Sequence, residues 1–286
     1  MAYDLTLSLT GANGDTIQFD NSTYIVTDGL KGFGIPATTV RIQESATDGG
    51  IFRHTKRGIR EVDMPIVIVG TDRADTETKM RRLSNALQNT LGAATLTATY
   101  ANGDVYYLKV YYAGGGETVF GQDAGLTFAR WVVTLQAPNP FWTSTTGNTF
   151  TVNAGNTGRG LLPKLSYMRV SSSQAIGTVT VANTAGDVPS FPVYTIYGPL
   201  STLSVTSGST GFTYNTAIAA GETITIDTAA GTVVDQAGVN KYANLGAAPK
   251  LFAIPPGTTT ITVNGTGATS ATQIACTYYP RREVLH

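Results

Sequence analysis

Alternation of apolar and polar residues is the main pattern along this chain, and it predicts β-strands over most of its length. Side chains of a strand point alternately to its two faces, so a period of two predicts sheets with one buried face. Asn-Gly pairs at positions 13–14 and 102–103 predict tight turns, because both central residues must accept a positive φ. The clearest strands of the first half are residues 4–9, 16–19, 22–26, 40–45, 64–69, 105–112 and 130–137.

One segment has the helical period instead. Four apolar residues spaced by three or four positions predict a single helix from about Ala74 to Leu91. Asp72 or Asp75 is predicted to cap its start, and Gly92 to follow its end. The apolar stripe consists of Met80, Leu83, Leu87 and Leu91.

The second half reads as strands and turns spaced about 8–12 residues apart, the spacing expected of a β-sandwich. Between the halves stands APNPFW (137–142), whose two prolines should end the strand before them. Lys, Arg, Asp and Glu number 26 in residues 1–144 and 12 in residues 145–286. We therefore predict two domains, 1–144 and 145–286, with a flexible joint in the Thr- and Gly-rich stretch 143–160.

The predicted fold class is mainly β, with an N-terminal β-sandwich-like domain that carries one α-helix and a C-terminal β-sandwich. Composition agrees, since glycine reaches 32 residues and only 13% of the 286 residues are charged. Net charge is zero, which argues against binding of nucleic acid or anionic lipid. Cys276 is the single cysteine, so no intrachain disulfide forms, and we expect it to be a buried small hydrophobe. The N-terminus lacks a signal-peptide pattern, which predicts synthesis in a reducing cytoplasm.

The search for reaction chemistry finds no catalytic set, and we expect no enzyme activity, metal site or cofactor. The two histidines are His54, in a polar run, and His286, too few with one cysteine for a His/Cys metal cluster. Asp227 is the most plausible acid of a glycosidase, yet its place in ITIDTAAGTV predicts a turn residue. Glycoside hydrolysis therefore stays the weakest alternative.

Two features suggest contacts with other protein chains. The strand at 105–112 places Tyr106, Leu108, Val110 and Tyr112 on one face, which we expect to lie under the helix stripe. Tyr107 and Tyr111 on its other face would stay exposed unless a second subunit covers them.

The second feature is the one basic cluster, Arg53, Lys56, Arg57 and Arg60. Three interpretations of this cluster stay open. It is a solvated strand face whose charge is balanced by Asp48, Glu61 and Asp63, or it contacts another subunit, or it lines a channel. We expect Arg57 and Arg60 to pair with carboxylates of a second subunit, at the same subunit interface as Tyr107 and Tyr111.

The order of these segments resembles the distal tail protein of siphophages, a phage tail family protein. The resemblance is carried by GLKGFGIPATTVRIQESATDGG (29–50), RHTKRGIREVDMPIVIVG (53–70), the lone helix and TLTATYANGDVYYLKVYYAGG (95–115). It continues through APNPFW, LLPKLSYMRV (161–170), ETITIDTAAGTVVDQAGVNKY (222–242) and IPPGTTTITVNG (254–265). Each motif alone is unspecific, and their order and spacing carry the comparison.

The resemblance implies a structural protein of the virion. Six copies of the N-terminal domain would close into a ring, a homohexamer, that joins the tail tube to the tail-tip hub of the baseplate. The C-terminal domain would be galectin-like and point outward. Expected partners are the chain itself, the tail tube protein and the hub protein, with the tape measure protein and receptor-binding proteins as further candidates in host attachment. Two alternatives remain open: a carbohydrate-binding adhesin, and the major tube subunit.

Overall fold

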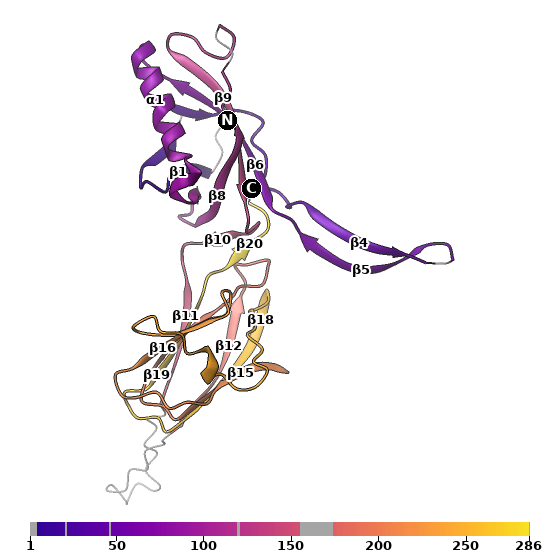
Figure 1. The fold of residues 1–286 in the computed structure, drawn as a ribbon, viewed down its shortest axis with the longest axis vertical. Coiled ribbons are helices and arrows are strands. Elements are labelled where there is room, and N and C mark those ends of the chain that lie inside the picture. Colours follow the sequence, from indigo (N-terminus) through magenta and orange to yellow (C-terminus); the bar gives the residue numbers. More distant parts are fainter. Residues whose placement is uncertain (1–4, 21, 46, 119–120, 155–173, 286) are drawn as a thin grey trace, which may run out of the picture. The chain divides into compact units, whose positions relative to one another are not determined.

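The computed structural model describes residues 5–20, 22–45, 47–118, 121–154 and 174–285, and they are mainly β (Figure 1). The chain divides into two compact units. The N-terminal unit runs to Thr145 and also includes the chain from Arg282 onward, and the C-terminal unit spans Thr146–Arg281. The end of the chain, which the sequence assigned to the second domain, therefore belongs to the first.

One nine-stranded antiparallel sheet forms the body of the N-terminal unit. Its main path runs β2-β1-β7-β8-β9-β6-β3, and β10 and β20 complete it. The two end strands of the path, β2 and β3, contact each other, so the sheet nearly closes on itself. The strands are β1 (Leu5–Thr10), β2 (Thr16–Phe19), β3 (Tyr24–Val26), β6 (Arg60–Val69), β7 (Ala94–Tyr100), β8 (Val105–Gly115), β9 (Phe128–Ala137), β10 (Trp142–Ser144) and β20 (Arg281–Arg282).

Alternate residues of these strands fill the inside of the curled sheet. Leu96, Leu108 and Leu135 are among the fully buried side chains. Trp142 from APNPFW lies in the same core, and its ring centroid is 5.0 Å from that of Phe33. The proline-flanked motif thus ends β9 and returns a large aromatic side chain to the core of the first unit.

The helix α1 (Arg73–Ala86) packs against β2, β6 and β9. Asp72 caps it, since its carboxylate accepts a hydrogen bond from Asp75 N, as predicted. The predicted helix ended five residues too late, because the α-helix ends at Ala86 and a short 3₁₀ turn, η1 (Asn89–Leu91), follows. Leu83 and Leu87 are buried, as the stripe predicted, whereas Leu91 is exposed beyond the helix end.

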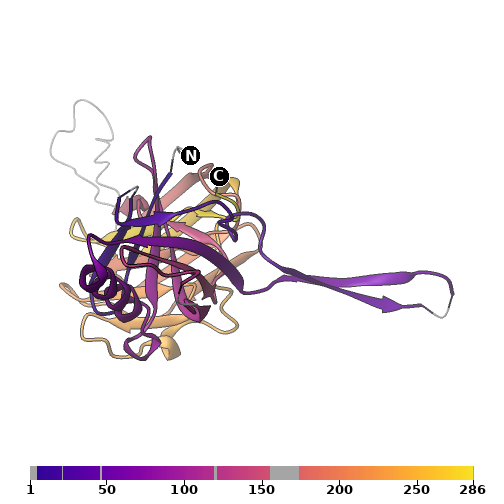
Figure 2. The same ribbon diagram turned by 90° about the horizontal axis from the view of Figure 1, so that it is seen from above.

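A separate two-stranded sheet consists of β4 (Thr38–Glu44) and β5 (Gly50–Arg57). Figures 1 and 2 show this hairpin extending away from the curled sheet of its own unit. Every residue of β4 is exposed, and β5 is exposed up to Lys56.

The C-terminal unit contains two sheets whose inner faces share one core cluster, the arrangement of a β-sandwich. The first sheet has the order β11-β19-β13-β16-β17 and the second β12-β18-β14-β15. A further 3₁₀ turn, η2 (Tyr242–Asn244), follows β17. The strands are β11 (Asn148–Asn153), β12 (Gln174–Asn183), β13 (Val193–Tyr197), β14 (Thr202–Ser207), β15 (Thr210–Tyr214), β16 (Thr223–Asp227), β17 (Thr232–Asp235), β18 (Gly257–Thr266) and β19 (Gln273–Tyr278).

The stretch 143–160 was predicted to be a flexible joint, but β11 lies within it and pairs with β19. The motif at 161–170 falls outside the described residues. Cys276 is buried in β19, as predicted, and burial raises the pKa of its thiol to about 12.

Candidate assembly surface

The β4–β5 hairpin has one apolar and one basic face. Ile42 and Phe52 lie opposite each other in the ladder, and Val40 is two residues from Ile42 on the same strand and hence on the same face. These three side chains are 61%, 59% and 53% exposed. Apolar residues directly opposite one another on an uncovered face indicate a surface that a partner covers.

An irregularity in the β4–β5 pairing determines which side chains lie on which face of the hairpin. Arg41 pairs with His54 and the next residue, Ile42, pairs with Phe52, which leaves Arg53 as an extra residue in β5. Such a bulge places two successive residues on one side of the strand. Arg53 Nε donates to Gln43 Oε1 at 2.7 Å, so its side chain lies on the face opposite Ile42. That face carries Arg41, Arg53, His54 and Lys56, together with Ile51.

The predicted basic cluster is therefore divided among three environments. Arg53 and Lys56 are exposed on the basic face of the hairpin. Arg57, at the base of the hairpin, forms an ion pair with Glu283 and donates to Thr38 Oγ1 at 2.7 Å. Among the ion pairs between described residues, none joins this cluster to Asp48, Glu61 or Asp63, the carboxylates expected to balance it.

Arg60 is buried, contrary to the sequence prediction. It was expected at a subunit joint, but it is only 1% exposed. Its guanidinium donates to four backbone carbonyl oxygens at 2.5–2.7 Å, those of Gly32, Gly34, Pro140 and Glu283. Burial lowers its pKa from the ordinary value and the nearby Glu283 opposes that shift, while an arginine stays charged in either case. Arg60 therefore links backbone segments within the N-terminal unit through hydrogen bonds, and its guanidinium is not available to a second subunit.

Strand β8 bears the predicted tyrosines. Tyr106 is buried, as predicted, and Tyr111 is 40% exposed on the opposite face, while Tyr107 beside it is half-buried. Tyr112 lies beneath the end of α1, as expected, but its side chain is 36% exposed because it lines an open pocket there. A role for Tyr107 and Tyr111 at a subunit interface stays a prediction.

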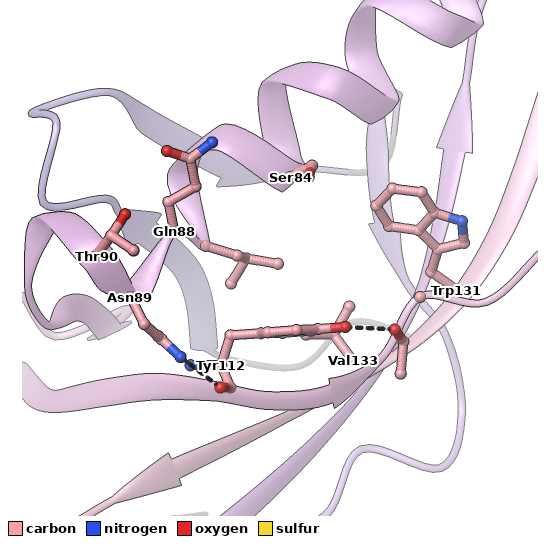
Figure 3. A pocket seen from close by; sticks show the side chains of 10 residues that line it. Ser84, Gln88, Asn89, Thr90, Tyr112, Trp131 and Val133 are labelled. Atoms are coloured by element: carbon pink, nitrogen blue, oxygen red, sulfur yellow. Dashed lines mark hydrogen bonds between the residues drawn. The ribbon is translucent and has the colours of Figure 1, made fainter.

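Tyr112 forms the floor of a pocket of about 530 Å³, with Trp131 at one side and the end of α1 above it (Figure 3). The polar groups around the opening come from Ser84, Gln88 and Thr90. Trp131 Nε1 donates to Thr118 Oγ1 at 2.8 Å, which fixes the indole ring. An aromatic floor with amide and hydroxyl groups at the rim suits a small polar ligand that also has apolar faces.

Asp227 and Asp235 of the C-terminal unit accept hydrogen bonds from backbone N–H groups in turns. Asp227 Oδ1 accepts hydrogen bonds from Ala229 N and Ala230 N, which confirms the turn role read from the sequence. Asp235 Oδ1 likewise accepts from Ala237 N and Val239 N. In the part of the chain that the structure describes, no three His, Cys, Asp or Glu side chains gather where they could hold a metal ion. Within the same part, none of the helices is long and apolar enough to cross a membrane.

Neither a family model nor a curated protein sequence matches this chain. Its structure, in contrast, matches solved phage proteins over nearly its whole length. The Dit protein of phage SPP1 superposes with a TM-score of 0.66 at 13% identity, covering 97% of this chain and 98% of that one. This chain has the fold of Dit. A chain of the phage P2 baseplate in its activated conformation with Ca matches at a TM-score of 0.53 and 10% identity, with all of both chains covered.

The same P2 baseplate with Sr gives a TM-score of 0.53 at 11% identity, covering 98% of this chain and 99% of the other. The Dit protein is described as a paradigm of the hub adsorption apparatus in phages that infect Gram-positive hosts. The mainly β architecture expected from the resemblance is thus confirmed at the level of the fold.

Sequence reasoning missed the exposed apolar face of the hairpin. Segment 40–45 was predicted as a strand, but its alternation alone does not say which face stays uncovered. The bulge at Arg53, which separates the basic from the apolar side chains, leaves no distinctive residue pattern. The glycines and Asp48 of the loop between the strands predict a hairpin, but a turn signal does not say whether its strands have other neighbours.

Proposed function

We propose that this protein is a structural component of a phage virion, located at the distal end of the tail, where copies of its N-terminal unit associate into a ring. The observation that carries the proposal is the whole-chain match to Dit. The match covers both units, so the similarity is not to a common β-sandwich alone.

The hairpin supports self-association. An isolated two-stranded hairpin is marginally stable in water and presents two unpaired strand edges. Here the hairpin also exposes Ile42 and Phe52 on one face. A second protein surface that covers this face would bury these apolar side chains and stabilise the hairpin. The hairpin extends from one side of its unit (Figure 2), and if it contacts a different surface of the next copy, the contact is heterologous and repeats from copy to copy.

A heterologous contact either closes into a ring or continues as a filament. The resemblance to the siphophage tail protein favours a ring of six copies that joins the tail tube to the tail-tip hub. Binding of the tube and hub proteins, and of the tape measure and receptor-binding proteins, belongs to the same proposal. The mature protein then resides in the virion and needs neither an enzymatic activity nor a cofactor.

Native mass spectrometry and negative-stain imaging of the purified protein test this function. We expect a discrete oligomer of six copies with a central opening, and labelling of virions at the tail tip by an antibody against the protein. A protein that stays monomeric both alone and with its tube and hub partners would disprove the tail-ring function. Long tubes in place of rings would instead support the major tube subunit.

Carbohydrate binding is the second candidate function, favoured by the pocket over Tyr112 and Trp131. Aromatic rings that stack on sugar faces and amide groups that bond hydroxyls are typical of such sites. A glycan array with the parent and with Trp131→Ala separates the candidates. Tight binding that the substitution abolishes, without oligomer formation, would favour an adhesin.

A further inference from the structure

The direction in which the β4–β5 hairpin extends depends on contacts at its base. Every residue of β4 is exposed, and β5 is exposed as far as Lys56. At the base, Thr38 and Arg57 form the first pair of the ladder, and Gly58 N donates to Ala37 O at 2.7 Å. These bonds join the two ends of the hairpin to each other and not to the curled sheet. The segments that lead into and out of the hairpin therefore determine its direction.

The segment that leads into the hairpin does not hold a direction by itself. Residues 32–37 read GFGIPA. Gly32 has a φ of +95°, and a Cβ added at Gly34 would meet no atom within 4 Å. Glycine leaves the backbone a wide choice of angles. Ile35, which follows, is 70% exposed and adds no packing to this segment.

The chain that follows the C-terminal unit ties this segment to the core. Residues from Arg282 onward belong to the N-terminal unit (Figure 1). The guanidinium carbon of Arg282 lies 4.5 Å from the centroid of the Tyr106 ring. Leu285 is 2% exposed in the core of this unit, and its backbone N–H donates to Phe33 O at 2.9 Å. The residue between the two glycines is thereby held against a buried anchor.

Glu283 fastens the segment that leads out of the hairpin. Its carboxylate forms the ion pair with Arg57, and its backbone carbonyl oxygen accepts a hydrogen bond from the Arg60 guanidinium at 2.5 Å. The same guanidinium donates to Gly32 O and Gly34 O. Residues 282–285 thus contact both segments at the base of the hairpin.

We propose that residues 282–285 act as a clamp that fixes the direction of the β4–β5 hairpin relative to the curled sheet of the same unit. The inference concerns a single copy and does not depend on what the hairpin binds. Glu283 and Arg60 are 223 positions apart, with the whole C-terminal unit between them. A chain folds from its N-terminal part as it is synthesised, so the hairpin receives its clamp only after the C-terminal unit has been made. The clamp couples the presentation of the apolar hairpin face to the synthesis of that unit.

Pulsed electron paramagnetic resonance measures this direction in the full chain. Nitroxide labels are attached at Ile51→Cys in the hairpin and Asn85→Cys on α1, both exposed positions, while Cys276 is buried and stays unlabelled. Ile42→Ser with Phe52→Ser is present throughout, so that no second copy holds the hairpin by its apolar face. An excess of unlabelled protein ensures that each distance comes from one copy. This protein is the labelled parent.

We expect a narrow distance distribution in the labelled parent. Glu283→Gln removes the ion pair and Leu285→Ala removes the buried anchor, and each should broaden the distribution. Two matched controls should leave it as narrow as in the parent. Glu77→Gln breaks the exposed ion pair with Arg81 on α1, and Leu96→Ala truncates another leucine of the same core.

Three outcomes would overturn the clamp. A broad distribution in the labelled parent would mean that the hairpin has no fixed direction. A distribution that stays narrow in both Glu283→Gln and Leu285→Ala would mean that residues 282–285 do not set it. Equal broadening by Leu96→Ala and Leu285→Ala would assign the effect to a loosened core. Should Leu285→Ala fail to fold, Glu283→Gln decides alone, because its ion pair is partly exposed and its loss leaves the unit folded. None of these results depends on ring formation, so the clamp and the proposed function fail separately.

Discussion

The side chain of Asn89 hydrogen-bonds the backbone of Tyr112 in both directions: its Nδ2 donates to Tyr112 O at 2.7 Å, and its Oδ1 accepts from Tyr112 N at 2.9 Å (Figure 3). Strand β7 pairs with β8 only as far as Ala94 opposite Val110. The amide of Asn89 therefore takes the place of a strand partner at the next backbone pair of β8. This bond pair holds the backbone of Tyr112 in place at the floor of its pocket.

Asn89→Ala should therefore destabilise the N-terminal unit by about 1–2 kcal/mol, because two backbone groups lose their partners. Asn89→Asp keeps the acceptor for Tyr112 N but places a carboxylate against Tyr112 O, so it should restore little. Denaturant unfolding followed by tryptophan fluorescence measures both changes. Gln88→Ala, at the adjacent rim position, is the control and should change stability by less than about 0.5 kcal/mol.

Arg60 and Arg57 are three residues apart, and their substitution should have very different effects. Arg60→Ala leaves four carbonyl oxygens without their charged donor in the interior, and we expect a loss of about 3 kcal/mol or more. Arg60→Lys should recover only part of this stability, since an ammonium group lacks the planar, multiply donating geometry of the guanidinium. Arg57→Ala breaks a partly exposed ion pair and should cost less than about 1 kcal/mol. Equal losses of unfolding free energy at the two positions would contradict this assignment.

Tyr107→Ser with Tyr111→Ser should give a folded protein that no longer forms the full oligomer, because these rings lie on the outer face of β8. The expected readout is a shift toward monomer in native mass spectrometry. Tyr112→Ser, on the same strand but over the pocket, is the matched control and should assemble. Assembly of the double variant at the parent's level would exclude these tyrosines from the interface.

Acid should weaken the contact between α1 and the turn before β2. Arg82 donates to both carboxylate oxygens of Asp15, at 2.7 and 2.8 Å, and these bonds lower the pKa of Asp15. A lowered folded-state pKa contributes stability above the unfolded pKa of about 3.9, and that stability is lost as the pH falls through the folded-state value. Asp15→Asn should cost less than about 1 kcal/mol near neutral pH, since the pair is partly exposed.

The measurement for Asp15 compares unfolding free energies of parent and variant near neutral pH and at about pH 3. The difference in unfolding free energy should shrink on acidification. The parent then loses the contribution of the ionised Asp15 carboxylate, which the variant lacks at every pH. A difference that is the same at both values would mean that the carboxylate charge of Asp15 does not contribute.

The local elements of this protein follow from its sequence alone. The period of two in segments 4–9 and 105–112 and the Asn-Gly turns predict hairpins from side-chain direction and backbone freedom, both of which act within a few residues. The start of α1 at Asp72 is equally local, since a cap needs only the first turn. The order of these segments was also sufficient to suggest the phage tail resemblance.

Only the tertiary structure decided which faces are covered. Arg60 and Arg57 look alike in the sequence, yet the carbonyl groups that surround Arg60 come from residues 28 and 26 positions before it, and 80 and 223 positions after it. Likewise, the alternation at 40–45 predicts a strand with one apolar face but cannot say whether a sheet of the same chain lies over it. Burial depends on which distant segments meet, and no segment that the structure describes covers Ile42 and Phe52, so the candidate assembly surface became visible only in the fold.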